Sequence, residues 1–254
     1  MISPGELIQL VSPQGKKYLI RVEVGKELHT HHGKIDISEV LEKDFGDEIK
    51  THLGKVYHIL KPTLYDLIKN IERKTQIIYP KDIGYILVRL GVGPGSKVVE
   101  AGCGSGSLTM SFAYMVGETG KVYSFDRREE FVSLCRKNLT KVGLESRVVL
   151  EVRDISEGFG LKGMDCGFLD VREPWLYVEQ FSETVKNGCV VGFLLPTTNQ
   201  VTTLLEALEK GPFIDIEVVE IMLRRYKPVY ERFRPEDRMV AHTGFLIFAR
   251  VKNK

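Results

Sequence analysis

Three glycines at alternate positions mark the stretch VVEAGCGSGSLTMSFA, which runs from residue 98 to residue 113. Gly102, Gly104 and Gly106 follow an apolar run typical of a buried strand, and a helical pattern begins directly after them. Glycine adopts positive φ and leaves the backbone open to a ligand, while the first turn of a helix offers free N–H groups. The stretch predicts a ligand-binding loop, although a glycine turn that serves only packing has the same pattern.

The spacing of the glycines separates two kinds of ligand. A dinucleotide-binding loop has the pattern G-x-G-x-x-G, in which the third glycine allows close packing of the helix on the strand. Ser107 occupies that sixth position here, so the spacing is G-x-G-x-G. The match to a pyrophosphate-binding loop is therefore only partial.

Three carboxylates end the apolar runs that follow the glycine loop. KVYSFD ends at Asp126, twenty residues after Gly106, where a carboxylate can accept hydrogen bonds from both hydroxyls of a ribose. VVLEVRD ends at Asp154, which can accept from an adenine amino group or can cap the helix start DISE. MDCGFLD ends at Asp170, at an edge where open parallel sheets bind ligands. A solvated acid at Asp126 and a turn at Asp170 are the structural alternatives.

The segments that position these acids alternate between apolar runs and helical patterns from about residue 80 onward. Strands apolar on both faces, each followed by a helix, predict an α/β fold with a parallel sheet covered on both sides. The last two runs, IDIEVVEIMLRRY and HTGFLIFARV, have no packed helix between them. We expect them to close the sheet as an antiparallel hairpin.

The first part of the chain has a different pattern. Residues 1–60 contain short alternating runs broken by turn residues, which predict a small β-rich, barrel-like domain. PTLYDLIKNIERK begins with proline and spaces its apolar residues at helical intervals, so residues 61–75 are predicted to form a linker helix. Residues 76–254 then form the α/β domain.

Composition narrows the class of protein further. The 254 residues are 43% hydrophobic and 28% charged, as in folded globular proteins, and the net charge of +2 does not identify a polyanionic partner. The apolar run CVVGFLLP is far shorter than the ~18 residues that a membrane span needs, and the N-terminus lacks the pattern of a signal peptide. Four widely separated cysteines indicate neither a disulfide framework nor a metal site. We expect a cytoplasmic enzyme with no metal and no membrane contact.

The glycine loop and the three strand-end acids together resemble the class I S-adenosylmethionine-dependent methyltransferases. That resemblance implies a Rossmann-like, seven-stranded sheet with an antiparallel last strand, in agreement with the expected terminal hairpin. It also implies that the loop holds a methionine and a ribose. A nicotinamide dehydrogenase would not obviously need Asp154 and Asp170.

Several further motifs are more specific than the glycine loop. QIIYPKD, EAGCGSGSLT, DVREPW, PTTNQ and HTGFLIFAR occur in the order found in the tRNA (adenine-N1)-methyltransferases that modify adenosine 58 of the T-loop, and the chain resembles that family over nearly its whole length. The resemblance implies S-adenosylmethionine as cofactor, tRNA as substrate and a homotetramer. It implies that Asp170 faces the target base as the catalytic residue. The implied cofactor contacts are Gln76, Ile77, Gly102, Gly104, Ser105, Gly106, Ser107, Leu108, Asp126, Arg127, Asp154 and Asp170.

Other residues are candidates for contact with RNA. Tyr79 in QIIYPKD is the candidate surface for an extruded base, since aromatic side chains commonly receive such bases, although a tyrosine at the edge of the core is the alternative. The basic and aromatic segment 223–238 could contact phosphates or could be a solvated loop or subunit contact. The substrate-binding candidates are Tyr79, Pro196, Gln200, Arg225 and Arg232.

Some features leave alternatives open. Arg172 stands where the family often has proline, and Leu194 where some relatives have an aromatic residue, so the shape of the substrate pocket is not predicted. His242 is as compatible with a structural role as with a pocket. A methyltransferase with a protein or small-molecule acceptor is the main alternative; a subunit that only binds RNA would be expected to lose the glycines or the acids. Methylation of position 57 as well is an open question.

Overall fold

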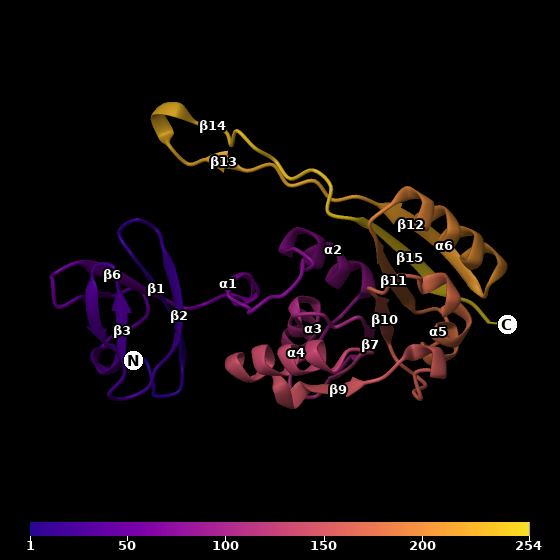
Figure 1. Cartoon of the computed structure of the whole chain (residues 1–254), viewed down its shortest axis with the longest axis horizontal. Coiled ribbons are helices and arrows are strands. Elements are labelled where there is room, and N and C mark those ends of the chain that lie inside the picture. Colours follow the sequence, from indigo (N-terminus) through magenta and orange to yellow (C-terminus); the bar gives the residue numbers. More distant parts are fainter. Residues whose placement is uncertain (254) are drawn as a thin grey trace. The chain divides into compact units, whose positions relative to one another are not determined.

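The computed structural model describes residues 1–253, which divide into two compact units between Asn70 and Ile71 (Figure 1). The three-part division at residues 60 and 75 stays a prediction, and the two units are described separately below. Within the described residues, no helix is long and apolar enough to cross a membrane.

The first unit is built mainly from short antiparallel strands. β1, β2, β5 and β6 form one sheet in the order β2-β1-β6-β5, and β3 and β4 form a separate hairpin. Tyr57, Ile8 and Leu10 are fully buried in its core, because alternate residues of each strand point to the same side. The strands are β1 (Leu7–Val11), β2 (Lys17–Arg21), β3 (Glu27–Thr30), β4 (Gly33–Asp36), β5 (Glu48–Lys50) and β6 (Val56–Leu60).

A short helix, α1 (Leu64–Lys69), ends the first unit. Thr63 and Asp66 form a reciprocal capping box, in which each side chain bonds the backbone N–H of the other. The helix is shorter than the predicted span of 61–75, because Asn70 ends it and the residues up to Tyr79 are not helical.

The second unit is an α/β domain with a seven-stranded sheet in the order β12-β15-β11-β10-β7-β8-β9. β15 runs antiparallel to both of its neighbours, whereas β7 to β11 pair in parallel. The predicted fold and its terminal antiparallel pair are confirmed. The strands are β7 (Lys97–Ala101), β8 (Lys121–Asp126), β9 (Val148–Val152), β10 (Cys166–Leu169), β11 (Val190–Leu195), β12 (Phe213–Val219) and β15 (Phe245–Val251), and the helices are α2 (Pro80–Leu90), α3 (Ser107–Val116), α4 (Glu129–Val142), α5 (Val178–Thr184) and α6 (Thr198–Lys210).

Helices cover both faces of this sheet. α2 packs on one face, where the Tyr85 ring lies 5.7 Å from the Phe248 ring, and α3 packs beside it. On the other face, Phe181 of α5 and Leu204 of α6 are fully buried against Phe193 and its neighbours. The alternation of β-strand side chains thus supplies two apolar layers, as expected of a sheet buried on both sides.

A long excursion separates β12 from β15. Residues 220–244, called the arm below, leave the end of β12, form the short strands β13 (Tyr226–Lys227) and β14 (Arg234–Pro235), and return to β15 (Figure 1). The sequence predicts the pairing of β12 with β15 but not this extended arm. Most residues of the arm are exposed.

Candidate active site

The glycine loop lies directly after β7, between two neighbouring strands of the sheet. Gly102 has φ of 92° and Gly106 has φ of 88°, values that L-residues with a Cβ rarely adopt. A Cβ on Gly102 would lie 2.1 Å from the Asp170 carbonyl oxygen, and one on Gly106 would lie 2.7 Å from Cys135 Sγ. Both glycines are therefore required by close packing, so the packing alternative accounts for these two positions.

Gly104 and Ser105 differ from the two packed glycines. Nothing lies within 4 Å of the place that a Cβ of Gly104 would occupy, so the middle of the loop borders open space. Ser105 is 3% exposed, and its Oγ is a buried hydroxyl without a hydrogen-bond partner among the described residues. Ser107 and Leu108, both buried, begin α3 directly after the loop. An open backbone beside an unpaired hydroxyl fits a polar ligand better than a turn made only for packing.

Asp126 holds the loop from the next strand. Its Oδ2 accepts from the Gly104 N–H at 3.3 Å, and its Oδ1 accepts from the Arg128 N–H at 3.1 Å. The side chain is 6% exposed, so it is not the solvated strand-end acid that is the structural alternative. Arg127 beside it is exposed.

Asp154 caps a short helical turn, as the DISE spacing suggested. Its Oδ1 accepts from the Ser156 N–H at 2.9 Å, and this backbone hydrogen bond is the main cause that lowers the pKa of Asp154. The side chain is exposed and borders the same cavity as Asp126. Capping and ligand contact are compatible, because the cap occupies only one of the two carboxylate oxygens.

Asp170 follows β10, which pairs with β7 on the side opposite β8. Its backbone N–H donates to the Ala101 carbonyl at 2.9 Å, so Asp170 and the glycine loop are joined. Asp170 is an exposed residue that borders the cavity, and the protein atoms around it desolvate its carboxyl. Burial first, and then the charge of Asp126, raise the pKa of Asp170 to about 7. This carboxyl can thus exchange a proton near neutral pH.

A cavity of about 400 Å³ brings these strand ends together. Five of the predicted site residues line it, and Tyr177 and several charged neighbours of the acids also line it. Most of these additional residues are sequence neighbours of the strand-end acids, and that proximity could have identified them. The predicted residues in the lining are Gly102, Asp126, Arg127, Asp154 and Asp170, and the residues not predicted are Ala101, Phe125, Arg128, Arg153, Ile155, Val171, Arg172, Glu173 and Tyr177.

Glu100 is a further residue that the sequence analysis missed. It is 1% exposed in β7, and its Oε2 accepts from Thr109 Oγ1 and Ser124 Oγ, each at 2.6 Å. Burial raises the pKa of Glu100 to about 7. Its signal was a charged residue inside the apolar run VVEA, and its contacts join α3 and β8 to the strand that carries the glycine loop.

The segment 76–79 leads into α2. Ile77 is buried and Gln76 is exposed, while Tyr79 is the N-cap residue of α2, which has Pro80 as its first residue. The Tyr79 hydroxyl donates to Gln76 Oε1 at 3.0 Å. Neither side chain is among those that line the cavity.

The PTTNQ segment is joined to the loop after β10. Gln200 Nε2 donates to the Arg172 carbonyl oxygen at 3.2 Å, and the Thr197 hydroxyl donates to Gln200 Oε1 at 2.7 Å. The Pro196 carbonyl accepts from His242 Nε2 at 2.9 Å. His242 therefore has a structural hydrogen bond on this segment, one of the two roles that the sequence left open.

Arg225 and Arg232 lie on the arm and not at the cavity. Arg232 borders a shallow hollow of the arm itself, together with Lys227, Val229 and Arg234. The structure thus brings together the cofactor candidates at the strand ends, and leaves the two arginine candidates on a separate element. Across residues 1–253, no cluster of three or more histidine, cysteine or acidic residues has a metal-binding arrangement.

A seven-stranded sheet with a reversed last strand, a glycine loop after its central strand and acids on the neighbouring strand ends define a class I methyltransferase fold. Residues 55–234 match the family described as tRNA methyltransferase complex GCD14 subunit, and residues 1–49 match the family described as TrmI-like N-terminal. The chain therefore belongs to the tRNA methyltransferase complex GCD14 subunit family.

Individual relatives cover nearly the whole chain. The tRNA (adenine(57)-N(1)/adenine(58)-N(1))-methyltransferase TrmI of Methanocaldococcus jannaschii is 35% identical over 95% of this chain and 94% of its own length. The structure of tRNA (m1A58) methyltransferase TrmI from Aquifex aeolicus is 39% identical, with a TM-score of 0.84, over 100% of this chain and 99% of its own. A Thermotoga maritima structure described as a SAM-dependent O-methyltransferase is 47% identical, with a TM-score of 0.91, over 100% of this chain and 95% of its own.

Proposed function

We propose that this protein transfers a methyl group from S-adenosylmethionine to N1 of adenosine 58 in the T-loop of tRNA. The observation that carries the proposal is the position of Asp170, whose backbone packs on the glycine loop and whose carboxyl opens into the cavity beside it. In the proposed complex, that carboxyl would lie where a cofactor on the loop and an acceptor base meet. The TrmI relatives from Methanocaldococcus and Aquifex support the choice of acceptor.

The cofactor is proposed to lie across the glycine loop. Gly104 offers open backbone and Ser105 an unpaired hydroxyl, with Gly102, Gly106, Ser107 and Leu108 shaping the surface around them. Asp126 and Asp154 would accept from the ribose and adenine, with Arg127 at the rim and Gln76 and Ile77 flanking the methionine. When bound, the sulfonium of S-adenosylmethionine supplies an electrophilic methyl group, so no metal is needed.

Asp170 has two tasks in this proposal. Its carboxylate accepts a hydrogen bond from the N6 amino group of adenine and thereby orients the N1 lone pair toward the methyl carbon. Methylation at N1 makes the base cationic and its N6 protons more acidic, so a carboxylate stabilises the developing charge or accepts a proton. A carboxyl whose pKa is about 7 is suited to that exchange. Alignment of the reactants contributes the rest of the rate enhancement.

The base must leave the folded tRNA before N1 is reachable. Tyr79 is half-buried at the start of α2 and presents an aromatic ring to receive it, and Pro196 and Gln200 would form the facing side. Gln200 donates to the carbonyl oxygen of Arg172, two residues after Asp170, so this segment is joined to the loop that carries the acid.

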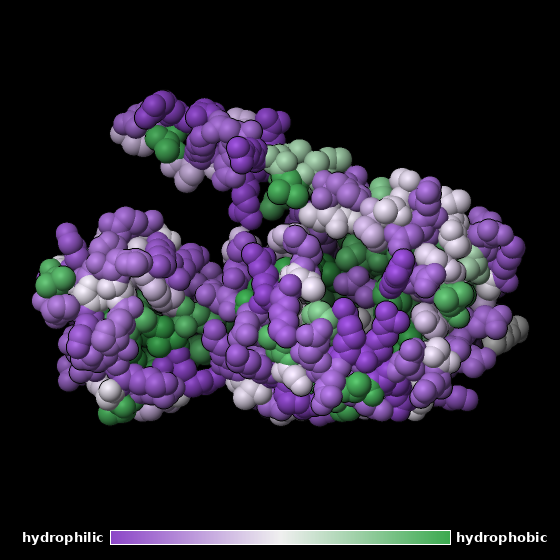
Figure 2. Space-filling view, in the orientation of Figure 1, coloured by the Kyte–Doolittle hydropathy of each residue, from purple (hydrophilic) through white to green (hydrophobic). Residues whose placement is uncertain are grey.

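We propose that the protein is a homotetramer and that its arms bind the tRNA. Arg225 and Arg232 would contact phosphates, which need not lie near the cavity. The arm also exposes large apolar side chains, among them Tyr230 at 89%, Phe233 at 69% and Met222 at 63%, beside strongly polar residues (Figure 2). Such residues favour a subunit contact, and several subunits would combine their basic faces around one tRNA. A cytoplasmic location belongs to the same proposal.

The structure from Thermotoga maritima that is described as an O-methyltransferase supports a second candidate, transfer to an oxygen. Nucleoside analysis of an unmodified tRNA transcript after incubation with labelled S-adenosylmethionine separates the two. We expect 1-methyladenosine, which is cationic and rearranges in alkali. A 2′-O-methylated nucleoside, or label found only on small hydroxyl acceptors, would replace the proposed function by the second candidate.

A further inference from the structure

A buried lysine joins α2 to both limbs of the arm. Lys81 is the second residue of α2, and its side chain is only 8% exposed. Its Nζ donates to the Ile221 carbonyl on the outgoing limb and to Thr243 Oγ1 on the returning limb, each at 2.6 Å. Both limbs are far from Lys81 in the sequence, so the lysine fastens the base of the arm to a distant helix.

Asp82 completes the arrangement around this ammonium group. It is 2% exposed; its Oδ1 accepts from Lys81 Nζ at 2.8 Å and its Oδ2 accepts from Thr243 Oγ1 at 3.0 Å. An ammonium group has three N–H donors, and all three are used here. A buried ion pair is costly unless it is fully hydrogen-bonded, and a network that is fully satisfied holds one arrangement. Lys81 thus fixes the arm base in a single position on α2.

The residue before Thr243 on the returning limb makes a second connection. His242 Nδ1 lies 2.6 Å from Glu220 Oε1, and His242 Nε2 lies 2.9 Å from the Pro196 carbonyl oxygen. Both partners are acceptors when Glu220 is ionised, so both ring nitrogens must carry a proton to make both bonds. His242 and Thr243 therefore link the arm to the two segments that flank the proposed base, the one with Tyr79 and the one with Pro196.

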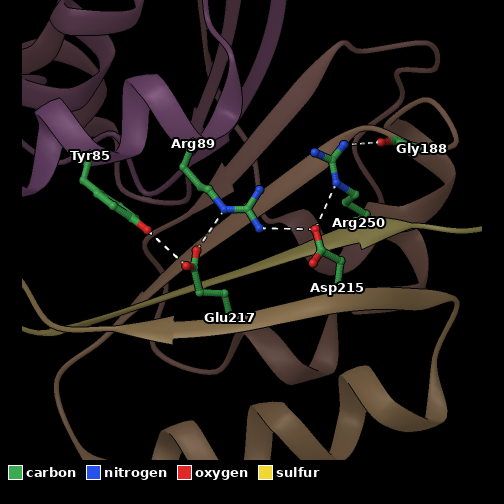
Figure 3. A network of polar contacts seen from close by, with 6 residues as sticks. All are labelled: Tyr85, Arg89, Gly188, Asp215, Glu217 and Arg250. Atoms are coloured by element: carbon green, nitrogen blue, oxygen red, sulfur yellow. Dashed lines mark hydrogen bonds and ion pairs between the residues drawn. The ribbon is translucent and has the colours of Figure 1, made fainter.

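The other end of α2 is fixed independently of the arm. Arg89 Nε donates to Glu217 Oε2 at 2.8 Å, and the Tyr85 hydroxyl donates to Glu217 Oε1 at 3.1 Å (Figure 3). Asp215 Oδ2 accepts from Arg89 at 3.4 Å and from Arg250 Nε at 3.1 Å. These contacts hold the C-terminal half of α2 to β12 and β15. The N-terminal half, which follows Tyr79, is joined by Lys81 to the base of the arm instead.

We propose that Lys81 is a positioning residue that couples the arm to the acceptor side of the active site, so that contact of the arm with RNA sets the position of Tyr79. The inference rests on the proposed function for its RNA partner. The geometry does not depend on the proposed function, because one buried cation is bonded to both limbs of the arm and belongs to the helix that Tyr79 caps. Lys81 bonds Ile221, Thr243 and Asp82 and not the glycine loop, so we expect its effect to be much larger on RNA than on S-adenosylmethionine, although Gln76 and Ile77 lie in the segment before it.

The test compares Lys81→Met with two other variants. Thr243→Val is a milder variant that removes one hydroxyl from the network. It provides the test if Lys81→Met does not fold. Lys210→Met is the control, because Lys210 is 73% exposed and pairs with Glu206 on the same helix, α6. For Lys81→Met we expect kcat/KM for tRNA to fall at least tenfold while the dissociation constant for S-adenosylmethionine changes less than twofold. Thr243→Val should have a smaller loss of the same kind, and Lys210→Met none.

Hydrogen exchange of the protein without RNA distinguishes failure of this inference from failure of the proposed function. Lys81→Met should speed amide exchange both at the arm base and in residues 76–83. When Lys81→Met and Thr243→Val are combined, the loss in kcat/KM for tRNA should be smaller than the sum of the two separate losses in free energy. Faster exchange in the arm alone, or parallel loss of S-adenosylmethionine and tRNA binding, would overturn the coupling. A wild-type protein that leaves tRNA unmethylated would instead refute the proposed function and leave the exchange result to decide the coupling.

Discussion

The cofactor edge of the sheet and the arm belong to the same unit but are built in opposite ways. In the glycine loop, Gly102 and Gly106 are closed in by protein, and Asp126 holds the backbone between them. In the arm, by contrast, Tyr230 and Phe233 are mostly exposed. The glycine loop is thus packed against residues of its own chain, whereas the arm presents exposed surface.

Two carboxyl groups, one from each region, have pKa values shifted in opposite directions. Asp170 borders the cavity, where desolvation by the surrounding protein and then the charge of Asp126 raise its pKa. Asp237 of the arm is exposed; hydrogen bonds from Lys227 and Arg234 lower its pKa to about 2. Exposed pairs of that kind contribute little to stability, because water and salt screen their charges. We therefore expect changes at the cofactor edge to alter chemistry and folding, and changes of exposed charges in the arm to alter mainly RNA binding.

The largest expected effect is that of Asp170→Asn. The amide keeps the size of the side chain but cannot accept a proton or stabilise a cation as a carboxylate does, so kcat should fall by roughly 10²-fold or more. Binding of S-adenosylmethionine should persist in calorimetry. Asp126→Asn is the contrasting variant, since it should weaken cofactor binding first. Near-normal turnover of Asp170→Asn would remove this residue from the mechanism.

The same carboxyl predicts a pH dependence. Its pKa of about 7 means that kcat/KM should rise as the pH increases through neutrality, and the acid limb should disappear in Asp170→Asn. Between its ordinary pKa of 3.8 and this raised value, the folded state binds more protons than the unfolded chain, so stability from this group falls as the pH rises. At pH 8, Asp170→Asn should therefore have a Tm equal to or above that of wild type. A lower Tm would contradict the raised pKa.

A pair of glycine variants tests the loop more finely. Gly102→Ala puts a Cβ against a backbone oxygen at 2.1 Å, so it should lower the Tm and abolish cofactor binding together. Gly104→Ala meets no atom within 4 Å but has φ of 51°, so it should cost only about 1–2 kcal/mol of folding stability. If the cofactor occupies that open space, its affinity should still fall at least tenfold. Unchanged affinity in Gly104→Ala would place the cofactor elsewhere.

Removal of two arm charges should have a smaller effect, confined to RNA. Arg225→Ala combined with Arg232→Ala should raise KM for tRNA several-fold and make binding less dependent on salt, because the logarithmic salt slope falls by about one unit for each phosphate that the protein no longer neutralises. The affinity for S-adenosylmethionine should not change. Arg136→Ala on α4 is the control, since it removes an exposed arginine that pairs with Glu145. An equal effect in the control would show a general influence of charge.

The smallest expected effect concerns His242. Its hydrogen bond to Pro196, and then the one to Glu220, raise its pKa, while the nearby charge of Lys81 opposes them. The ring of Phe245 packs on it at 4.9 Å and carries no charge. The stabilisation from protonated His242 is fully present below its ordinary pKa of 6.5. It is lost as the pH rises through the raised pKa that His242 has in the folded protein. A titration of the His242 ring by NMR should show this raised pKa, and Glu220→Gln should lower it.

The sequence predicted the sheet and several of the residues that follow its strands. The G-x-G-x-G spacing and the acids after three apolar runs indicated the sheet and its reversed last strand, because short-range patterns determine them. Of the residues that line the cavity, the sequence indicated Gly102, Asp126, Arg127, Asp154 and Asp170, and their roles stay predictions. The arm was missed because residues 220–244 show no apolar periodicity of their own. The contacts of Lys81 and His242 could not be predicted either, since each joins segments that only the folded sheet brings together.

The most direct test of the central claim is methyl transfer to two transcripts of one tRNA, one intact and one with guanosine in place of adenosine 58. We expect labelled 1-methyladenosine in the intact transcript and its loss in the substituted one, with a residual amount only if position 57 is an adenosine that is also methylated. Equal formation of 1-methyladenosine in both transcripts, or label in neither, would contradict the assignment of adenosine 58 as the acceptor.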